Sequence, residues 1–215
     1  MSRIRIIFEK RGLFTFVNHM DLPVVFSRAA RRAGLTQEFT QGFSPHPRIS
    51  LASPLAIGVE GLAEPADFWF EKWDEESFLR WSAMLPEGLK ILKYAEVEDG
   101  LNLAKLIDAA VYRISGEGAP LDGRAAQVLS DEAARLNALF ACSFAEGTVT
   151  LTVGHLEHCG AGLLVKALAA AGVVSGWQDL RMERLTVGKW NAEAGAVLPP
   201  VSYTHLRAHE TCADL

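Results

Sequence analysis

The sequence has few cysteines and no uninterrupted apolar segment long enough for a membrane helix. Its three cysteines, Cys142, Cys159 and Cys212, have no paired spacing, which argues against a disulfide framework and favours a reducing compartment. The longest apolar stretch, residues 160–177, is interrupted by Lys166 and several glycines. The first residues, MSRIRIIFEKRG, lack the apolar core of a secretory signal. These absences predict a cytoplasmic protein that does not associate with membranes.

Motifs of several catalytic and cofactor-binding classes are also missing. The sequence contains no CxxxCxxC run for an iron–sulfur cluster, no G-x-G-x-x-G, no Walker loop and no nucleophile elbow around a serine. His155, His158 and Cys159 are possible metal ligands, but no second cluster supplies the four ligands of a structural zinc site. We therefore expect no metal site and no bound cofactor, and we favour a non-catalytic role.

Charge is distributed unevenly along the 215 residues. The whole chain has a net charge of −5, which argues against a uniformly basic coat for nucleic acid. Residues 1–59, however, hold eight basic and three acidic side chains, so this part carries +5 and the remainder carries −10. The two parts are expected to meet different partners.

Apolar periodicity in the first half predicts the order strand, helix, strand, strand, helix, strand. Residues 3–10 alternate between apolar and polar, as in a strand. From Leu22 to Ala33 the apolar residues recur at helical spacing, which predicts a helix that Asp21 caps and Gly34 ends. Similar patterns predict an extended segment at 13–17, strands at 48–55, 67–73 and 89–97, and a helix at 75–85. This order is typical of a ferredoxin-like, or split βαβ, unit.

The second half has a similar order of expected elements. The patterns predict strands at 109–114, 140–144, 148–153 and 180–187, and helices at 124–139 and 162–171. The fold class is therefore expected to be α+β, with two ferredoxin-like units in tandem and helices on one face of each antiparallel sheet. The expected boundaries are 1–98 for the first unit, 104–198 for the second, and 199–215 for a disordered or artefactual tail after two prolines.

A basic helix face and a proline-rich segment stand out in the first unit. Arg28, Arg31 and Arg32 lie at i, i+3 and i+4, away from the apolar stripe of the expected helix. The segment QGFSPHPR at 41–48 has prolines on both sides of His46, which stiffen its backbone. Arginine forks suit phosphate or carboxylate, and aromatic rings can stack on bases. The candidate residues for binding an anion or nucleic acid are Arg28, Arg31, Arg32, Gln41, Phe43, His46 and Arg48. A solvated helix face and a rigid connector remain the alternative interpretations.

Several separated motifs resemble those of one known family. They occur in the expected order at residues 8–12 (FEKRG), 19–21 (HMD), 28–34 (RAARRAG), 41–48 (QGFSPHPR) and 53–60 (SPLAIGVE). The stretch from residue 3 to about residue 97 is similar to the radical SAM-linked protein family, DUF2344. The resemblance implies a protein encoded beside, or fused to, a radical SAM protein, and here a free-standing partner of that iron–sulfur enzyme.

Three functions remain open at this point. We favour an accessory protein that binds RNA or another anionic substrate for a radical SAM enzyme. One alternative is a metal-independent RNA-processing enzyme with His46 or His19 as general base, because histidine can transfer protons near neutral pH. For His19, beside Asp21, a structural role is the preferred interpretation. The other alternative is a protein–protein adaptor that binds no nucleic acid.

Overall fold

The computed structural model describes residues 1–98, 100 and 102–200. The first half contains β1 (Ser2–Lys10), α1 (Leu22–Arg32), β2 (Ile49–Leu51), β3 (Glu60–Phe70), α2 (Glu75–Ala83) and β4 (Leu89–Val97). The second half contains β5 (Ala109–Gly116), α3 (Gly123–Arg135), β6 (Leu139–Ala145), β7 (Thr148–Gly154), α4 (Ala161–Ala170), β8 (Leu180–Asn191) and β9 (Ala196–Leu198). Short 3₁₀ helices are η1 (Gly12–Phe16), η2 (His19–Asp21), η3 (Leu103–Leu106) and η4 (Trp177–Asp179).

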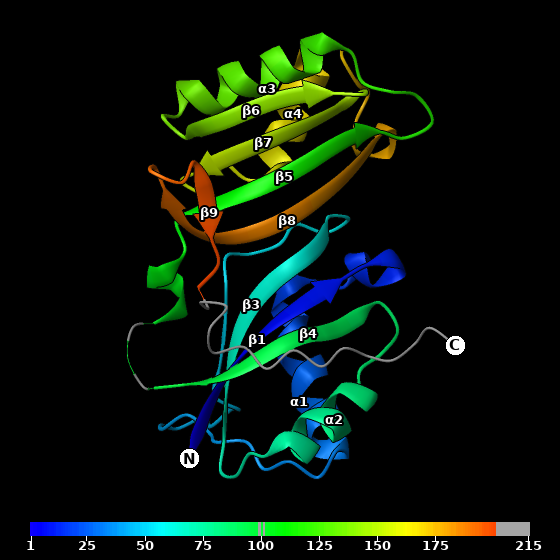
Figure 1. Cartoon of the computed structure of the whole chain (residues 1–215). Helices are drawn as coiled ribbons and strands as arrows, with labels where there is room; N and C mark the ends of the chain where they lie inside the picture. Colours follow the sequence, from blue (N-terminus) through cyan, green and yellow to red (C-terminus); the bar gives the residue numbers. More distant parts are fainter. Residues whose placement is uncertain (99, 101, 201–215) are drawn as a thin grey trace, which may run out of the picture.

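Within these residues the fold is mixed α+β, with four α-helices and nine strands in a mostly antiparallel sheet (Figure 1). This confirms the expected α+β class. The strand order is β4-β1-β3-β8-β5-β7-β6, with β2 paired to β3 and β9 paired to β8. No helix in the described part of the chain is both long and apolar enough to cross a membrane.

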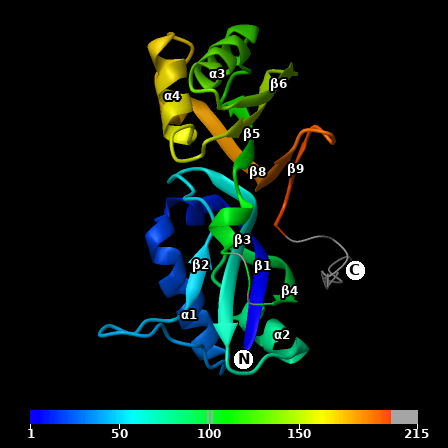
Figure 2. The same ribbon diagram turned by 90° about the vertical axis from the view of Figure 1, so that its left-hand side faces the viewer.

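The two halves have corresponding strand arrangements. In the first, β1 lies between β4 and β3, and β2 pairs with the outer side of β3. In the second, β5 lies between β8 and β7, and β6 pairs with the outer side of β7. The halves meet where β3 and β8 run parallel, at the pairs Glu60–Glu183 and Gly61–Arg184 (Figures 1 and 2).

The core of the first half is built from alternate residues of β1 and the inner faces of two helices. Ile4, Ile6 and Phe8 are buried against α1 and α2, as period-2 alternation requires for one face of a strand. Phe26 of α1 and Trp81 of α2 meet edge to face at 5.9 Å, and the Trp81 indole donates to the Phe26 carbonyl at 3.2 Å. This packing confines the polar side of α1 to the protein surface.

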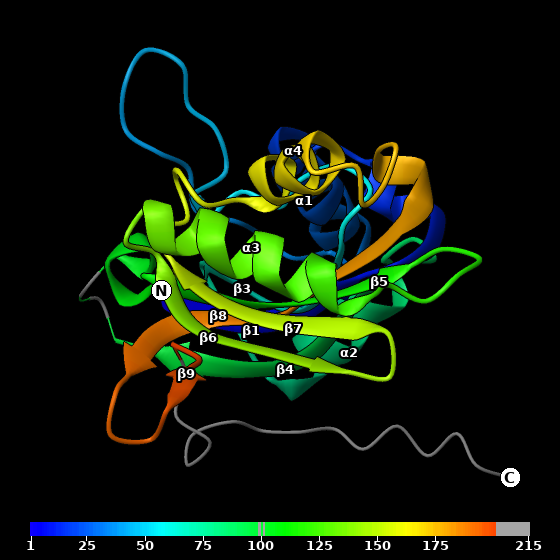
Figure 3. The same ribbon diagram turned by 90° about the horizontal axis from the view of Figure 1, so that it is seen from above.

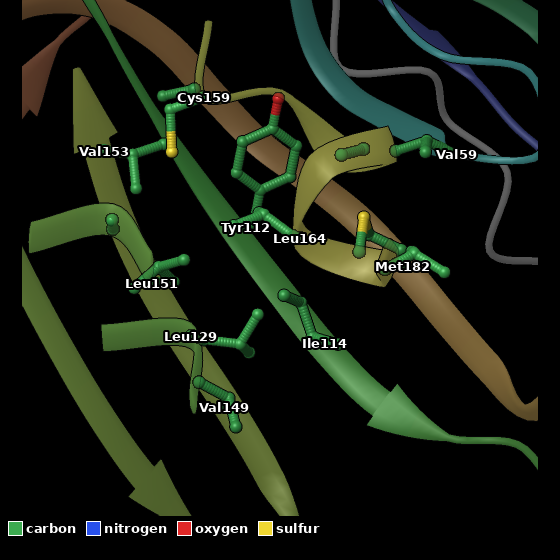
Figure 4. Packing of buried hydrophobic residues seen from close by; sticks show 14 of the residues in the cluster. Val59, Tyr112, Ile114, Leu129, Val149, Leu151, Val153, Cys159, Leu164 and Met182 are labelled. Atoms are coloured by element: carbon green, nitrogen blue, oxygen red, sulfur yellow. The ribbon is translucent and has the colours of Figure 1, made fainter. Parts of the chain in front are cut away.

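The second core joins both halves of the chain. Ile114, Leu129 and Leu151 lie at its centre, between the sheet and the helices α3 and α4 (Figure 4). Leu55 and Val59, which precede β3, are buried in the same cluster. The segment before β3 therefore contributes to the core of the second half.

Several local predictions differ from the structure. Residues 13–17 were expected to be extended, but Gly12–Phe16 form η1. The buried Lys10 ammonium donates to the carbonyls of Thr15 and Val17, and this tertiary contact favours the turn. The strand expected at 48–55 is only Ile49–Leu51, and the strand expected to begin at 67 begins at Glu60. β3 is longer because it pairs with β1 over most of its length.

Part of the expected tail is described. Pro199 and Pro200 are half-buried, and the Pro200 carbonyl accepts a hydrogen bond from Arg5 at 2.8 Å. The rest of the predicted tail, 201–215, lies outside the described residues.

Candidate anion-binding site

One stripe of α1, opposite its buried face, carries three polar side chains and one valine. Val24, Ser27, Arg28 and Arg31 lie at i, i+3, i+4 and i+7, so they share one side of the helix. Leu22, Phe26, Ala29 and Ala30 are buried on the opposite side. Arg28 and Arg31 are exposed and have no hydrogen-bond or ion-pair partner among the described residues. Two unneutralised guanidinium groups therefore lie one helical turn apart.

The chain after α1 folds into a narrow hairpin. Gln37 bridges to Phe70 at the end of β3, and Phe39 bridges to Pro47. The Thr40 amide donates to the His46 carbonyl at 2.8 Å. Pro45 and Pro47 have no amide hydrogen, which limits ladder formation to these isolated contacts. The segment projects from the body beyond α1, as the blue loop in Figures 2 and 3 shows.

A cavity of about 640 Å³ lies between the α1 stripe and the base of this hairpin. We call it the α1 cavity; its lining residues are Pro23, Val24, Ser27, Arg28, Arg31, Leu35, Thr36, Gln37, Phe39, His46, Pro47 and Ile49. Its volume falls in the range of small-molecule pockets, roughly 300–1,000 Å³. The cavity therefore brings together three of the predicted site residues, Arg28, Arg31 and His46.

Two polar atoms in the lining have no partner. Ser27 Oγ and Gln37 Nε2 are buried and make no hydrogen bond among the described residues. Gln37 as a whole is only 8% exposed, so its side chain is nearly inaccessible to solvent. A buried polar group without a partner costs about 1–3 kcal/mol, and such groups are rare in folded proteins. These two atoms are therefore available to a ligand.

The other predicted site residues lie outside the α1 cavity. Arg32 donates to the carbonyl of Met84 at 2.6 Å and so connects α1 to the end of α2. Arg48 lies 3.3 Å from Glu38 and stacks over Trp69, with its guanidinium carbon 4.2 Å from the ring centroid. Gln41 and Phe43 are exposed at the hairpin tip, where Phe43 is fully accessible. The structure thus brings together only part of the predicted set.

Other positive charges of the first half are used in internal contacts. Arg3 and Arg5 are buried and share the carboxylate of Asp67, with shortest contacts of 2.6 and 2.7 Å. Arg11 is 3.3 Å from Glu9. Among the basic residues of 1–59, Arg3, Arg5 and Arg11 therefore have acidic partners, whereas Arg28 and Arg31 have none in the described part of the chain.

The ring of His46 is held by the hairpin. Its Nδ1 lies 3.3 Å from the Ser44 carbonyl and 3.2 Å from Thr40 Oγ1. The backbone amide of His46 also donates to Thr40 Oγ1 at 3.3 Å, so both the ring and the backbone of His46 contact Thr40. His46 is exposed, so its ring is accessible to a bound molecule.

His19 lies at a second cavity between the two halves. This junction cavity, of about 450 Å³, is lined by residues that include His19, Leu55, Tyr112 and Gly160. Burial lowers the pKa of His19, and the nearby cation Arg184 lowers it further. The Leu55 amide lies 3.5 Å from Nδ1, which leaves the hydrogen of the neutral ring on Nε2. His19 and His46 therefore lie at two different cavities.

No group of three or more histidine, cysteine, aspartate or glutamate side chains is placed to hold a metal ion in the described ranges. His155 and His158 both approach Glu157, at 3.8 and 4.0 Å, while Cys159 is buried. Serine, glutamine and arginine side chains in the α1 cavity suit hydrogen bonding and anion binding instead.

The fold and the cavity define an α+β protein with a ligand-sized pocket bordered by two arginines. A family model described as "Uncharacterized protein conserved in bacteria (DUF2344)" matches residues 3–142, and the chain belongs to this family. Membership of DUF2344, which the sequence motifs predicted, is thereby confirmed, and the link to a radical SAM protein stays a prediction.

Comparisons with individual proteins add little. A search of curated proteins gives no match. One solved structure, described as a "putative glycine cleavage system transcriptional repressor", is 10% identical, with 85% of this chain and 98% of that chain covered. Its TM-score of 0.23 is too low to support an argument.

Sequence reasoning missed both cavity residues whose buried polar atoms have no partner among the residues described, Ser27 and Gln37. Ser27 could have been included because it lies on the same helical stripe as Arg28 and Arg31. Gln37 carried no such signal, since its pairing with Phe70, a residue far along the chain, places it at the cavity.

Proposed function

We propose that this protein is a non-catalytic binding protein that holds RNA or another anionic substrate at the α1 cavity. The observation that carries the proposal is the pair of exposed, unpartnered guanidiniums of Arg28 and Arg31 at the rim of a ligand-sized cavity. Arginine binds phosphate through parallel hydrogen bonds, and His46 can add a contact from the hairpin. The exposed Phe43 at the hairpin tip is available for stacking on a base.

The proposal also includes the architecture and the partner predicted from the sequence. The strand orders β4-β1-β3-β2 and β8-β5-β7-β6 support two ferredoxin-like units, at 1–98 and 104–198. The radical SAM enzyme remains the proposed partner, by resemblance to the radical SAM-linked family, and the cytoplasm remains the proposed location. In this scheme the protein positions the substrate, and the partner performs the chemistry.

Binding of a labelled single-stranded RNA at several salt concentrations tests the site. The double variant Arg28→Glu/Arg31→Glu should bind at least tenfold more weakly, and the slope of log K against log salt should fall by about 1.4 for two lost phosphate contacts. Lys105→Glu/Lys166→Glu is a matched control, because both lysines are exposed and carry the same charge change away from the cavity. Equal affinity and slope in the first variant would exclude this placement of the site.

A second candidate is metal-independent RNA cleavage with His46 as general base. It is favoured by the exposed position of the His46 ring, which Thr40 and Ser44 hold at the hairpin. Cleavage of RNA in the presence of a chelator, lost in His46→Ala, would support it over simple binding.

Binding of a radical SAM partner that persists in moderate salt, without any RNA binding, would favour the adaptor hypothesis instead.

A further inference from the structure

The α1 cavity has features that a bare phosphate would not need. Its walls include the apolar side chains of Val24, Leu35, Phe39 and Ile49. A phosphate bound by two arginines gains nothing from apolar walls, because it remains hydrated on its other sides. The ligand that matches the whole cavity therefore has an apolar or planar body as well as an anionic group.

The two unpartnered polar atoms indicate which chemical groups the planar or apolar part of the ligand carries. Gln37 Nε2 is a donor in a side chain that is more than nine-tenths buried, and Ser27 Oγ can donate or accept. Both residues line the cavity, Ser27 from α1 and Gln37 from the segment that follows α1. A body inserted between them needs hydrogen-bonding atoms on its edge, which a hydrocarbon chain does not have.

We propose that the α1 cavity takes one unstacked nucleotide. Its base inserts between α1 and the hairpin, with an acceptor on the base edge meeting Gln37 Nε2, and its phosphate binds Arg28 and Arg31. A base in duplex RNA cannot enter such a pocket, whereas single-stranded RNA and free nucleotides can present an unstacked base. The inference rests on the proposed anion site and adds to it the class of ligand.

The anchored backbone at Gln37 makes its side chain suitable for recognising the edge of a base. Its main chain is held by the bridge to Phe70, and the neighbouring Glu38 amide donates to the Trp69 carbonyl at 2.9 Å. The side chain can therefore be changed without removing the contacts that anchor the hairpin. Gln37→Leu and Ser27→Ala remove only atoms that have no partner in the described structure.

Calorimetric titration of the full chain with single compounds tests the proposal. The probes are the four nucleoside monophosphates, ribose 5-phosphate, which lacks the base, and octyl phosphate, which replaces the base by a hydrocarbon chain. At least one nucleoside monophosphate should bind about tenfold more tightly than ribose 5-phosphate, as expected for one enclosed base. Gln37→Leu and Ser27→Ala should each reduce that difference and leave ribose 5-phosphate binding unchanged.

Ser82→Ala is the matched control for Ser27→Ala. Ser82 Oγ is also buried without a partner, but Ser82 does not line the α1 cavity. Its loss should leave every affinity unchanged, and thermal unfolding of all three variants should show that they fold.

The possible outcomes separate this inference from the proposed function. Equal binding of ribose 5-phosphate and the nucleotides, both lost in Arg28→Glu/Arg31→Glu, would overturn the base pocket and keep the anion site. Tight binding of octyl phosphate that is insensitive to Gln37→Leu would also overturn it. Failure of every probe to bind would reject this inference, whereas RNA that still binds through Arg28 and Arg31 would leave the proposed function standing.

Discussion

Arg184 of β8 and Glu64 of β3 form a buried two-point ion pair between the halves of the sheet. Nε of Arg184 lies 2.8 Å from Oε1 of Glu64, and Nη2 lies 2.6 Å from Oε2. The same guanidinium donates to the carbonyls of Ser53 and Pro54. Burial alone would lower the pKa of Arg184, but Glu64 and Tyr112 outweigh this effect and raise it. The arginine is therefore charged at all physiological pH values and links three segments.

Arg184→Met should destabilise the protein strongly. The substitution leaves the Glu64 carboxylate buried without its counter-ion, and breaking a buried pair in this way costs about 3–5 kcal/mol. Urea unfolding measures the change in the free energy of unfolding. The double variant Arg184→Met/Glu64→Gln should recover part of the loss, because it leaves no uncompensated charge; a double variant less stable than the single one would contradict this account.

Asp67→Asn should also be costly. The carboxylate of Asp67 accepts from both Arg3 and Arg5, and all three side chains are buried. Removing the negative charge takes away the buried counter-ion that the two guanidiniums share, so a loss of about 3 kcal/mol or more is expected in urea unfolding. Glu132→Gln is the control: Glu132 and Arg135 are equally close, at 2.7 Å, but Arg135 is exposed and little change should be measured.

His19 should make stability depend on pH below neutrality. Its pKa in the folded protein is below the ordinary 6.5, first because of burial and then because of Arg184. As the pH falls below about 6.5, the unfolded chain gains a proton at His19 before the folded chain does, so stability decreases until the folded pKa is passed. Unfolding free energies measured in urea at several pH values between 5 and 7.5 show this slope.

His19→Asn is the matching variant for the pH experiment. An asparagine side chain keeps a polar group near the Leu55 amide but does not titrate. The variant should lose the part of the slope that His19 contributes, and an unchanged pH profile would mean that His19 is equally protonated in both states.

Cys159 should be unreactive in the folded protein. Burial raises the pKa of its thiol to about 11, and only the thiolate reacts readily with alkylating reagents. After iodoacetamide treatment at pH 8, mass spectrometry of peptides should find Cys159 unmodified in the native protein and modified after unfolding in urea. Rapid native labelling would mean that the second core opens easily.

Local patterns predicted much of the fold because they depend on neighbours in sequence. The alternation in β1 placed Ile4, Ile6 and Phe8 on one face, and the helical spacing in α1 placed Phe26 inside; both predictions are confirmed, because all four residues belong to one core cluster. Asp21 stands at the N-cap of α1, but its side chain makes no capping hydrogen bond. The boundaries of β2 and β3 were missed because pairing with distant strands, and not local composition, decides where a strand ends.

The candidate site shows the same division between local and distant effects. Helical spacing put Arg28 and Arg31 on one exposed face, and the two prolines predicted a stiff segment around His46. Arg32 and Arg48 met the same sequence criteria, yet Met84 of the α2 end and Glu38 with Trp69 engage them. Only the folded chain distinguishes an arginine with a neighbour from one without.

By itself, the sequence determined the family, the α+β class and the stripe of α1 that faces outward, because motifs and apolar periods are properties of short segments. Tertiary structure alone decided that Gln37 lines the same cavity as this stripe, that Leu55 and Val59 join the second core, and that Arg184 meets Glu64. These contacts join residues far apart in the chain, and their positions follow from how the strands pair and not from any repeating pattern along the sequence.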